Sequence, residues 1–306
     1  MPLVSVCMTT YNHEAYISQA IESVLAQHTD FGVEIVIGED CSTDSTLEIC
    51  RRYEQQYPDV VRVVTSPQNV GMHANYRRTI EACRGEYIAM LDGDDYFSDS
   101  NKLQMQVGAI EEAGAAMCYT RSERKSQTKS TIYPQGKLHE SFADMLVLNT
   151  AENCTTLARR DMILRYYDEV KPHLYNWQTD DLPMWLWFAA RSKYMGIDCP
   201  MAVHRVLRES VSHNPDYRKK IEFVDSLYDI SLWYDERYNN GRMRDELLRT
   251  KHNTALWVLS YNGGIGEYLG RWWHDIQEYR PLMKSIAAYG LFVKKVCWRM
   301  WRKTAR

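Results

Sequence analysis

The chain has 306 residues, 45% of them hydrophobic and 25% charged, and its 37 Lys and Arg nearly balance 40 Asp and Glu to give a net charge of -3. This composition is that of an ordinary folded protein with a substantial core, and the near-neutral charge gives no sign of the basic surface that nucleic-acid binding requires, so we expect no nucleic-acid partner. The eight cysteines are scattered without a Cys-x-x-Cys pair, which argues against a zinc site and against a dense disulfide framework.

Strand and helix patterns alternate along the amino-terminal third of the chain. Short apolar runs with the length of buried strands lie at residues 3–8, 33–37, 60–64 and 87–91. Apolar residues at helical spacing separate these runs, and Asn12 or His13 is placed to begin the first helix. The alternation predicts an α/β fold with a mostly parallel, doubly wound sheet.

Polar residues follow three of these strands at their predicted carboxyl ends. They are Thr9 to Asn12, Glu39-Asp40 and Asp92 to Asp95. Because parallel strands bring their carboxyl ends to one edge of a sheet, where ligands bind, these residues are expected to form a single site. The chain has no Gly-x-Gly-x-x-Gly after the first strand and no P-loop motif, which disfavours a dinucleotide-dependent dehydrogenase and a P-loop phosphotransferase.

The stretch Asp92-Gly93-Asp94-Asp95 places three carboxylates within four residues. Such close like charges raise one another's pKa values unless a cation lies among them, and Mn²⁺ or Mg²⁺ prefers carboxylate oxygens and bridges to phosphate. The carboxylates of this stretch are therefore candidate metal ligands. An acidic turn that merely ends a strand explains this stretch equally well when it is taken alone.

Four segments in order resemble the signatures of family 2 glycosyltransferases, which have the GT-A fold. They are residues 4–12, 34–44, 69–71 and 91–95. The resemblance implies a catalytic domain at 1–215, with a nucleotide-sugar half at about 1–100 and an acceptor half at about 101–215.

The resemblance also implies roles for individual residues and a nucleotide-sugar donor. Thr10 and Tyr11 would line the nucleoside pocket, Asp40 would hold the base, and Asp92 would approach the ribose or the metal of a DXD motif. Asp94 would bind the metal, which makes it the first candidate for a metal ligand and Asp92 the second, while Asp95 is expected only to cap the next element. The full set implied to bind the nucleotide is Thr9, Thr10, Tyr11, Asn12, Glu39, Asp40, Asp92 and Gly93. A UDP-sugar is the favoured donor. Glu39 and Cys41 stand where many relatives have Asp and Gly, which leaves the nucleotide base open.

The middle of the chain continues the α/β pattern. Residues 101–112 predict a helix and residues 115–119 a strand. The polar, basic stretch at 121–137 predicts a solvated loop, with a lid over the donor as the alternative.

An acidic pair, Asp180-Asp181, precedes an apolar helix that has Pro183 in its first turn. Either aspartate could cap this helix. The pair also resembles the family's acidic pair, and that resemblance implies a base that takes a proton from the acceptor hydroxyl in an inverting transfer. By position in the family motif Asp181 is the better candidate for the base, and Asp180 is the alternative.

Residues 202–213 resemble the segment that closes the catalytic domain in relatives. A cationic side chain here could contact the diphosphate, so Arg205 and Arg208 are candidates. The alternative is a surface strand with ordinary charges.

From residue 216 the sequence predicts a helical appendage that runs to residue 306. Residues 289–306 mix aromatic residues with Lys and Arg, which suits peripheral contact with an anionic membrane, although a helix packed on the body is the alternative. The chain has no apolar run of roughly 18 residues and no signal-peptide pattern, so we expect a cytoplasmic protein, with this tail at the inner face of the membrane.

Together these features predict a metal-dependent inverting glycosyltransferase. The expected acceptor is a hydroxyl of a glycan or a lipid-linked sugar in bacterial lipopolysaccharide, capsule or exopolysaccharide synthesis. A nucleotidyltransferase that makes the activated sugar is one rival, although the first strand lacks a Gly-rich, Arg-bearing loop for a triphosphate. A non-catalytic sugar-nucleotide-binding scaffold is the other, and the acidic pair speaks against it.

Overall fold

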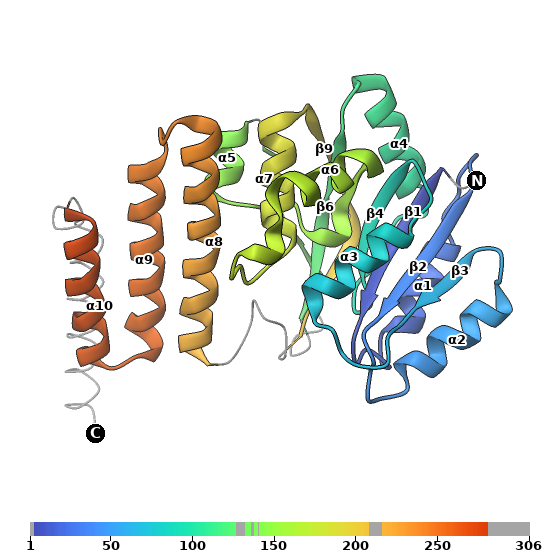
Figure 1. Ribbon diagram of the computed structural model, residues 1–306, viewed down its shortest axis with the longest axis horizontal. Coiled ribbons are helices and arrows are strands. Elements are labelled where there is room, and N and C mark those ends of the chain that lie inside the picture. Colours follow the sequence, from blue (N-terminus) through green and yellow to red (C-terminus); the bar gives the residue numbers. More distant parts are fainter. Residues whose placement is uncertain (1–2, 127–131, 136–137, 140, 208–215, 281–306) are drawn as a thin grey trace. The chain divides into compact units, whose positions relative to one another are not determined.

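The computed structural model describes residues 3–126, 132–135, 138–139, 141–207 and 216–280 (Figure 1). Its residues cluster into two compact units. The first unit combines residues 1–176 with 180–206, and the second combines 177–179 with 207–306. The first unit thus ends at residue 206, whereas the sequence predicts a domain boundary after residue 215. Residues 208–215 lie outside the described ranges.

The first unit is built on a nine-stranded sheet in the described part of the chain. Its strands are β1 (Val4–Thr10), β2 (Val33–Glu39), β3 (Val61–Val64), β4 (Tyr87–Asp92), β5 (Tyr96–Phe97), β6 (Met117–Ser126), β7 (Ile132–Gln135), β8 (Thr156–Arg159) and β9 (Tyr194–Val206). They are ordered β3-β2-β1-β4-β8-β6-β9-β5, and β7 pairs with β6 outside this path. The four strands β3-β2-β1-β4 run parallel, as the sequence predicts.

The remainder of the sheet is mixed. Strand β8 runs antiparallel to both β4 and β6, while β9 runs parallel to β6 and antiparallel to β5. Because β8 runs opposite to both β4 and β6, strands β6 and β9 have the same direction as β1 to β4, so the carboxyl ends of β1, β2, β4 and β9 lie at one edge of the sheet. The first three of these strands belong to the nucleotide-sugar half of the predicted domain and β9 belongs to the acceptor half.

Helices and short 3₁₀ turns connect the strands of the first unit. They are α1 (Ile17–Leu25), α2 (Thr46–Gln56), α3 (Met72–Ala82), α4 (Lys102–Ala113), α5 (Phe142–Val147), η1 (Asn153–Thr155), α6 (Arg160–Val170), η2 (Pro172–Leu174) and α7 (Asp181–Arg191). Helix α1 buries its apolar face in the same core as the inward side chains of β1 and β2. It begins at Ile17, later than expected, because Asn12 has a left-handed backbone (φ 56°) and is tied by its side chain to Thr43.

The prediction of a solvated loop over residues 121–137 is wrong for the described parts of that stretch, while the alternative of a lid over the donor stays a prediction. Residues 121–126 continue β6 beside β9, and residues 132–135 form β7. Polar side chains are accommodated in β6 because they find partners there: Ser122 Oγ donates to Glu152 over 2.5 Å and Arg124 Nη2 donates to the same carboxylate over 2.6 Å.

The second unit contains three helices in its described residues, α8 (Tyr217–Asn239), α9 (Arg244–Asn262) and α10 (Ile265–Glu278). Helix α9 packs on both α8 and α10, and Leu248, Leu256 and Tyr268 belong to their shared apolar core. The predicted helical appendage is thereby confirmed for residues 217–278. The tail at 289–306 and Arg208 lie outside the described residues. Within the described residues, no helix has both the length and the apolar character needed to cross a membrane.

Candidate active site

The register of the parallel strands brings the predicted polar residues to one edge of the sheet. Thr9 of β1 is the partner of Asp92 in β4, and Thr10 is the partner of Glu39 in β2. The Asp40 N–H also donates to the Thr10 carbonyl over 3.1 Å. The ends of three strands therefore form one connected surface.

The Asp92 carboxylate is fixed at both oxygens. Thr9 Oγ1 donates to Oδ1 over 2.7 Å, and Asn153 Nδ2 donates to Oδ2 over 2.9 Å. Tyr76 donates its hydroxyl to Asn153 Oδ1 over 2.6 Å, which orients the amide. Burial and the nearby Asp94 charge raise the pKa of Asp92, although these hydrogen bonds oppose the shift. The side chain is thus held in one orientation at the end of β4.

Asp94 differs from Asp92 in its contacts. Burial and the charge of Asp95 raise the pKa of Asp94, while His13 and His204 favour its charged form. Among the described residues no other side chain donates a hydrogen bond to the Asp94 carboxylate, so both of its oxygens are available to a ligand. A carboxylate with a raised pKa and free oxygens suits a hard divalent cation, which would relieve the repulsion.

Gly93 permits the close approach of this loop to β1. A Cβ atom at Gly93 would lie 2.6 Å from Thr10 Oγ1 and 3.0 Å from His13 Nδ1. The Gly93 N–H donates to the Thr9 carbonyl over 2.8 Å. Any larger residue would push the acidic loop away from the end of β1.

The sequence predicts that Asp95 caps the next element, but in the structure Asp95 joins the acidic loop to β9. Its carboxylate accepts the Arg205 backbone N–H over 2.8 Å and lies 3.1 Å from His204 Nδ1. Burial lowers the pKa of His204, but the Asp95 charge outweighs that effect and raises it to about 9, so a charged His204 faces Asp95 at neutral pH. The ion pair fixes the carboxyl side of the acidic loop.

Arg205 lies beneath the acidic loop and not on a surface strand. It is 6% exposed, donates to the Asp94 carbonyl and to Gln19 Oε1, and its guanidinium lies 4.7 Å from the Tyr96 ring centroid and 5.1 Å from that of Tyr16. The guanidinium group of Arg205 therefore supports the backbone of the acidic loop. Contact between Arg205 and a diphosphate stays a prediction.

Glu39 and Asp40 shape the loops around the site. Glu39 is fully buried, and its carboxylate accepts the N–H groups of Cys41 and Ser42. Asp40 accepts the Val70 N–H over 2.9 Å and the Gly71 N–H over 3.0 Å. A nucleotide base that bound Asp40 would share these oxygens, which a carboxylate with about four lone-pair sites allows.

Helix α3 is anchored to the end of β2. Asn75 Nδ2 donates to the Gly38 carbonyl over 2.8 Å, and Arg78 Nη2 donates to the Glu39 carbonyl over 2.7 Å. A Cβ atom at Gly38 would lie only 1.8 Å from Thr79 Oγ1, so glycine is needed for this approach. The first turn of α3 is thereby fixed beside the Asp40 loop.

Tyr11 and Asn12 continue from the end of β1. Tyr11 is 43% exposed, so its ring is open to a ligand. Asn12 Oδ1 accepts the Thr43 N–H over 2.8 Å, and its own N–H donates to Ser42 Oγ over 3.0 Å. Asn12 therefore ties together the loops that follow β1 and β2.

The acidic pair begins helix α7, and its members have different surroundings. Asp180 is 6% exposed, and its Oδ1 contacts Nδ1 of His73 in the first turn of α3, whereas its Oδ2 has no hydrogen-bond partner among the described residues. Asp181 is half-buried, and its Oδ1 accepts the Leu182 N–H over 2.6 Å. Because His73 follows the loop that Asp40 holds, the pair is linked to the nucleotide side of the predicted site.

Three residues in this arrangement were not singled out by the sequence as site residues: His13, His73 and Asn153. His13 Nδ1 is buried near Gly93 and has no hydrogen-bond partner among the described residues. His13 directly follows the Thr9 to Asn12 stretch, where the sequence indicates only a possible helix start. No comparable signal accompanies Asn153 or His73.

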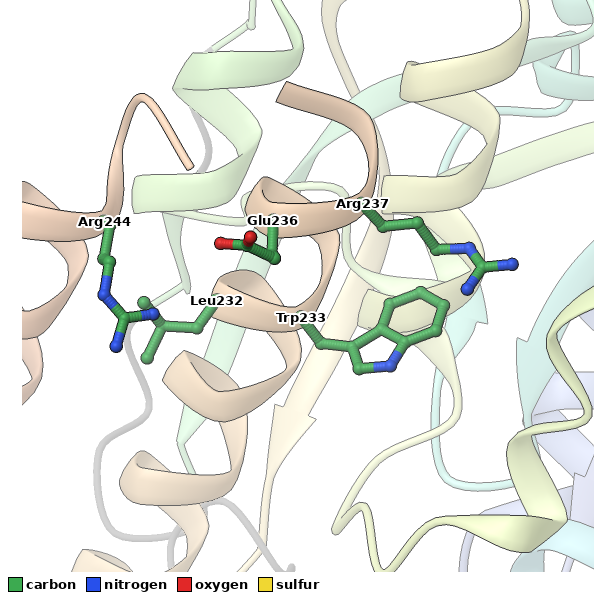
Figure 2. Close-up of a pocket in the computed structure, with 5 residues that line it drawn as sticks. All are labelled: Leu232, Trp233, Glu236, Arg237 and Arg244. Carbon is green, nitrogen blue, oxygen red and sulfur yellow. The ribbon is translucent and has the colours of Figure 1, made fainter. Parts of the chain in front are cut away.

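The second unit has a cavity of its own, with a volume of about 490 Å³. Figure 2 shows its lining, which is formed by Leu232, Trp233, Glu236 and Arg237 of α8 and Arg244 of α9. The Arg237 guanidinium lies 5.1 Å from the Trp233 ring centroid. None of the predicted site residues lines this cavity.

A mixed sheet flanked by helices, with four parallel strands, an acidic loop at the end of β4 and a helical unit after the sheet, defines a class, the GT-A glycosyltransferase fold. Staphylococcus aureus TarS 1-349, solved with UDP-GlcNAc, matches with a TM-score of 0.58 and 16% identity over 92% of this chain and 90% of TarS 1-349. The mannosyltransferase PcManGT from Pyrobaculum calidifontis, solved with GDP-Man and Mn²⁺, matches with a TM-score of 0.56 and 14% identity over 99% of this chain and 88% of its own. At such identities the likeness establishes the fold alone.

Sequence comparisons establish the family. The model of glycosyl transferase family 2 matches residues 5–166, and the chain belongs to this family. Bacillus subtilis TuaG, whose name assigns it provisionally as a glycosyltransferase of teichuronic acid biosynthesis, is 30% identical over 70% of this chain and 82% of its own length. An uncharacterized Mycobacterium tuberculosis protein, Rv1520, is 42% identical over 34% of this chain, but the match spans only 30% of that relative's length.

Proposed function

We propose that this chain transfers a sugar from a nucleotide-sugar donor to a hydroxyl group of a glycan or lipid-linked acceptor, with inversion at the anomeric carbon and with a divalent cation. The observation that carries the proposal is the pair of carboxylates at the end of β4. Asp92 is fixed at both oxygens, whereas Asp94 has a raised pKa and oxygens free of side-chain donors in the described part of the structure.

Asp94 and Asp92 would hold Mn²⁺ or Mg²⁺. The fit rests on the donor set, because carboxylate oxygens are the ligands these cations prefer and free oxygens on Asp94 need no rearrangement to bind one. When bound, the cation would offset the negative charge that develops on the departing nucleoside diphosphate. Arg205 would keep Asp94 in position through its contact with the Asp94 carbonyl.

The donor nucleoside would lie on the surface formed by the ends of β1 and β2. The exposed ring of Tyr11 can stack on a base, and the buried Thr10 hydroxyl has no hydrogen-bond partner among the described residues and could donate to the ribose or phosphate. A UDP-sugar is our first choice of donor, and the complex of TarS 1-349 with UDP-GlcNAc supports it. The GDP-Man complex of PcManGT makes a GDP-sugar the alternative.

Asp181 would act as the base. In the proposed step it accepts the proton of the acceptor hydroxyl while the acceptor oxygen bonds to the anomeric carbon and the bond to the nucleoside diphosphate breaks. Its partial exposure suits contact with an acceptor, while the buried Asp180, paired with His73, would fix the start of α7. Asp180 remains the alternative base because its Oδ2 is free of partners within the described residues.

The acceptor would belong to bacterial surface-polysaccharide synthesis. The similarity to TuaG over 82% of that protein supports this context. A cytoplasmic location with residues 289–306 in peripheral contact with the membrane would bring the enzyme to a lipid-linked acceptor.

The proposal is tested by measuring donor binding and product release with the full chain. A panel of UDP-, GDP- and other nucleotide sugars is screened by thermal shift, because a ligand that prefers the folded state raises its stability. Release of nucleoside diphosphate is then measured with and without Mn²⁺, for the wild type and for Asp94→Asn. We expect release that requires the cation and the Asp94 carboxylate. Pyrophosphate release from a nucleoside triphosphate would instead identify a nucleotidyltransferase, and donor binding without turnover over a broad acceptor panel would identify a scaffold.

A further inference from the structure

A second group of side chains with metal-binding atoms lies in the helical unit and shares no residue with the proposed active site. It consists of His252 on α9 with Asp275 and Glu278 on α10. One ligand atom from each residue lies within 4.8 Å of the others. Asp275 and Glu278 are three positions apart, so they share a face of α10, and the packing of α10 on α9 presents that face to His252.

His252 and Asp275 are fully buried, yet they do not satisfy each other by a hydrogen bond. His252 Nδ1 lies 3.2 Å from Asp275 Oδ2. Within the described residues both His252 ring nitrogens and Asp275 Oδ2 have no hydrogen-bond partner, although the two side chains are close enough to form an ion pair. Buried polar atoms without partners are rare in folded proteins and call for an explanation.

The separation of these atoms is that of two ligands on one metal ion. Zn²⁺ binds imidazole nitrogen at about 2.0 Å and carboxylate oxygen at about 2.1 Å, so two ligands in a tetrahedral site lie roughly 3.4 Å apart. The observed 3.2 Å between Nδ1 and Oδ2 is close to that value. A cation between them would satisfy both atoms with little movement of the two helices.

The second oxygen of Asp275 is already held. Arg271 Nε donates to Oδ1 over 2.6 Å, and both Nη atoms of Arg271 donate to Asp225 on α8 over 2.8 Å each. The Tyr279 ring stacks on His252 with 6.1 Å between centroids. Outer contacts of this kind orient metal ligands and select one of their atoms for the ion, here Oδ2 of Asp275.

We propose that His252, Asp275 and Glu278 form a site for a divalent transition-metal cation of the Zn²⁺ type that joins α9 to α10. Imidazole together with carboxylate oxygens is a donor set that Zn²⁺ accepts, and the cysteine spacing of this chain excludes only sites built on cysteine pairs. Glu278 is exposed, so it can swing onto the cation and leave a fourth position for water. The role is structural, since the cation would pin two helices and carry no substrate of the proposed transfer.

Zn²⁺ binding to the full chain tests the proposal, with the metal alone as the probe. We expect one equivalent to bind and to raise the melting temperature, and chelation with EDTA to reverse the shift. Glu278→Gln, an exposed change that leaves the buried pair intact, should weaken Zn²⁺ affinity by about tenfold or more, because even residues beyond the ligands contribute about 10- to 100-fold. His252→Gln should abolish the Zn²⁺-dependent shift, whatever its effect on stability.

Two control variants separate this site from the proposed active site and from adventitious binding. Asp94→Asn should keep Zn²⁺ binding to the helical unit while losing Mn²⁺-dependent turnover. The variant His173→Gln, a change at an exposed histidine of η2 that is not part of the cluster, should bind Zn²⁺ as the wild type does. Zn²⁺ binding that is unaffected by Glu278→Gln and His252→Gln, or no binding at all, would overturn the proposal and leave His252 and Asp275 as a plain ion pair.

Discussion

Asn153 in η1 donates its side-chain N–H to Oδ2 of Asp92 over 2.9 Å and so holds the last residue of β4 from the opposite side to Thr9. Asn153 and Asp92 are 61 positions apart in the chain. Because Asp92 is a proposed metal and nucleotide contact, Asn153 would act on the donor through the orientation of that carboxylate.

Replacing Asn153 should weaken donor use without unfolding the protein. Asn153→Ala removes one charge-assisted hydrogen bond to Asp92, worth about 1.5–3 kcal/mol, so kcat/KM for the donor should fall by roughly 10- to 100-fold. Kinetics at several Mn²⁺ concentrations measure the effect, and excess Mn²⁺ should restore part of the activity. The exposed Asn101→Ala is the matched control and should leave the kinetics unchanged. Normal kinetics for Asn153→Ala would show that Asp92 does not need this support.

Gly93→Ala should displace the acidic loop. The added Cβ would lie 2.6 Å from Thr10 Oγ1, a distance that real contacts do not reach, so the loop must move from β1. We expect a loss of about 1–3 kcal/mol in stability from this overpacking, together with weaker nucleotide binding. Gly108→Ala in α4 is the control, because its Cβ meets nothing within 4 Å, and it should stabilise the helix by about 0.5–1 kcal/mol. Chemical denaturation and nucleotide titration measure both effects.

Arg205 should matter for both the fold and the site. Arg205→Ala leaves the Asp94 carbonyl and Gln19 without their donor and removes the cation from between Tyr16 and Tyr96, so we expect a loss of about 2–4 kcal/mol. Arg205→Lys keeps the charge but not the planar fork and should recover only part of the stability. The exposed Arg165→Ala serves as control. If Arg205→Lys restored the wild-type melting temperature and donor KM, the guanidinium geometry would be irrelevant.

The sequence predicts which residues gather at the carboxyl ends of β1, β2 and β4, because that information is local. Strand runs, their polar ends and the acidic stretch can each be found within about ten residues, and parallel pairing brings those ends together without further assumptions. Asp92 and Thr9 are adjacent in the sheet for that reason.

The partners of the acidic residues could not be predicted in the same way. Asp180 contacts His73 across 107 positions, and Asp95 meets the Arg205 N–H across 110. No periodicity encodes such contacts, so the sequence predicts only that Asp95 caps a neighbouring element, and it does not predict the contact of Arg205 with the acidic loop. The same limit explains the error at 121–126, where Glu152 satisfies polar side chains that suggest a loop when the sequence is taken alone.

Glu34 lies at the edge of the sheet opposite to the candidate active site and should make the stability of the protein depend on pH. It is 2% exposed, and although burial raises its pKa, hydrogen bonds from Ser5 and Arg84 outweigh that effect and hold the pKa below its ordinary value of 4.5. A lowered pKa in the folded state means that the stabilisation is fully present above about pH 4.5 and is lost as the pH falls through the folded-state pKa.

Glu34→Gln should therefore destabilise the protein by about 1–2 kcal/mol at pH 7, a low estimate because Arg84 is more than half exposed. The difference from the wild type should shrink as the pH falls below 4.5. Glu81→Gln, which breaks an exposed pair with Arg77, should cost less than about 0.5 kcal/mol at every pH. Urea unfolding at pH 7, 5 and 3.5 measures these differences, and a constant gap between Glu34→Gln and the wild type would contradict the linkage.

Substitutions at Asp181 and at Asp180 should have different effects on catalysis and on stability. Asp181→Asn removes the proposed base but keeps the shape of a half-buried side chain, so turnover should fall by about 100- to 10,000-fold while donor binding and the melting temperature stay near wild type. Asp180→Asn changes a buried residue that contacts His73, so it should lower the melting temperature and reduce turnover less. His73→Gln should resemble Asp180→Asn, because it removes the other half of that contact. Single-turnover rates, donor titration and thermal unfolding of the three variants distinguish the roles. If Asp180→Asn abolished turnover at unchanged stability while Asp181→Asn stayed active, the free Oδ2 of Asp180 would be the base.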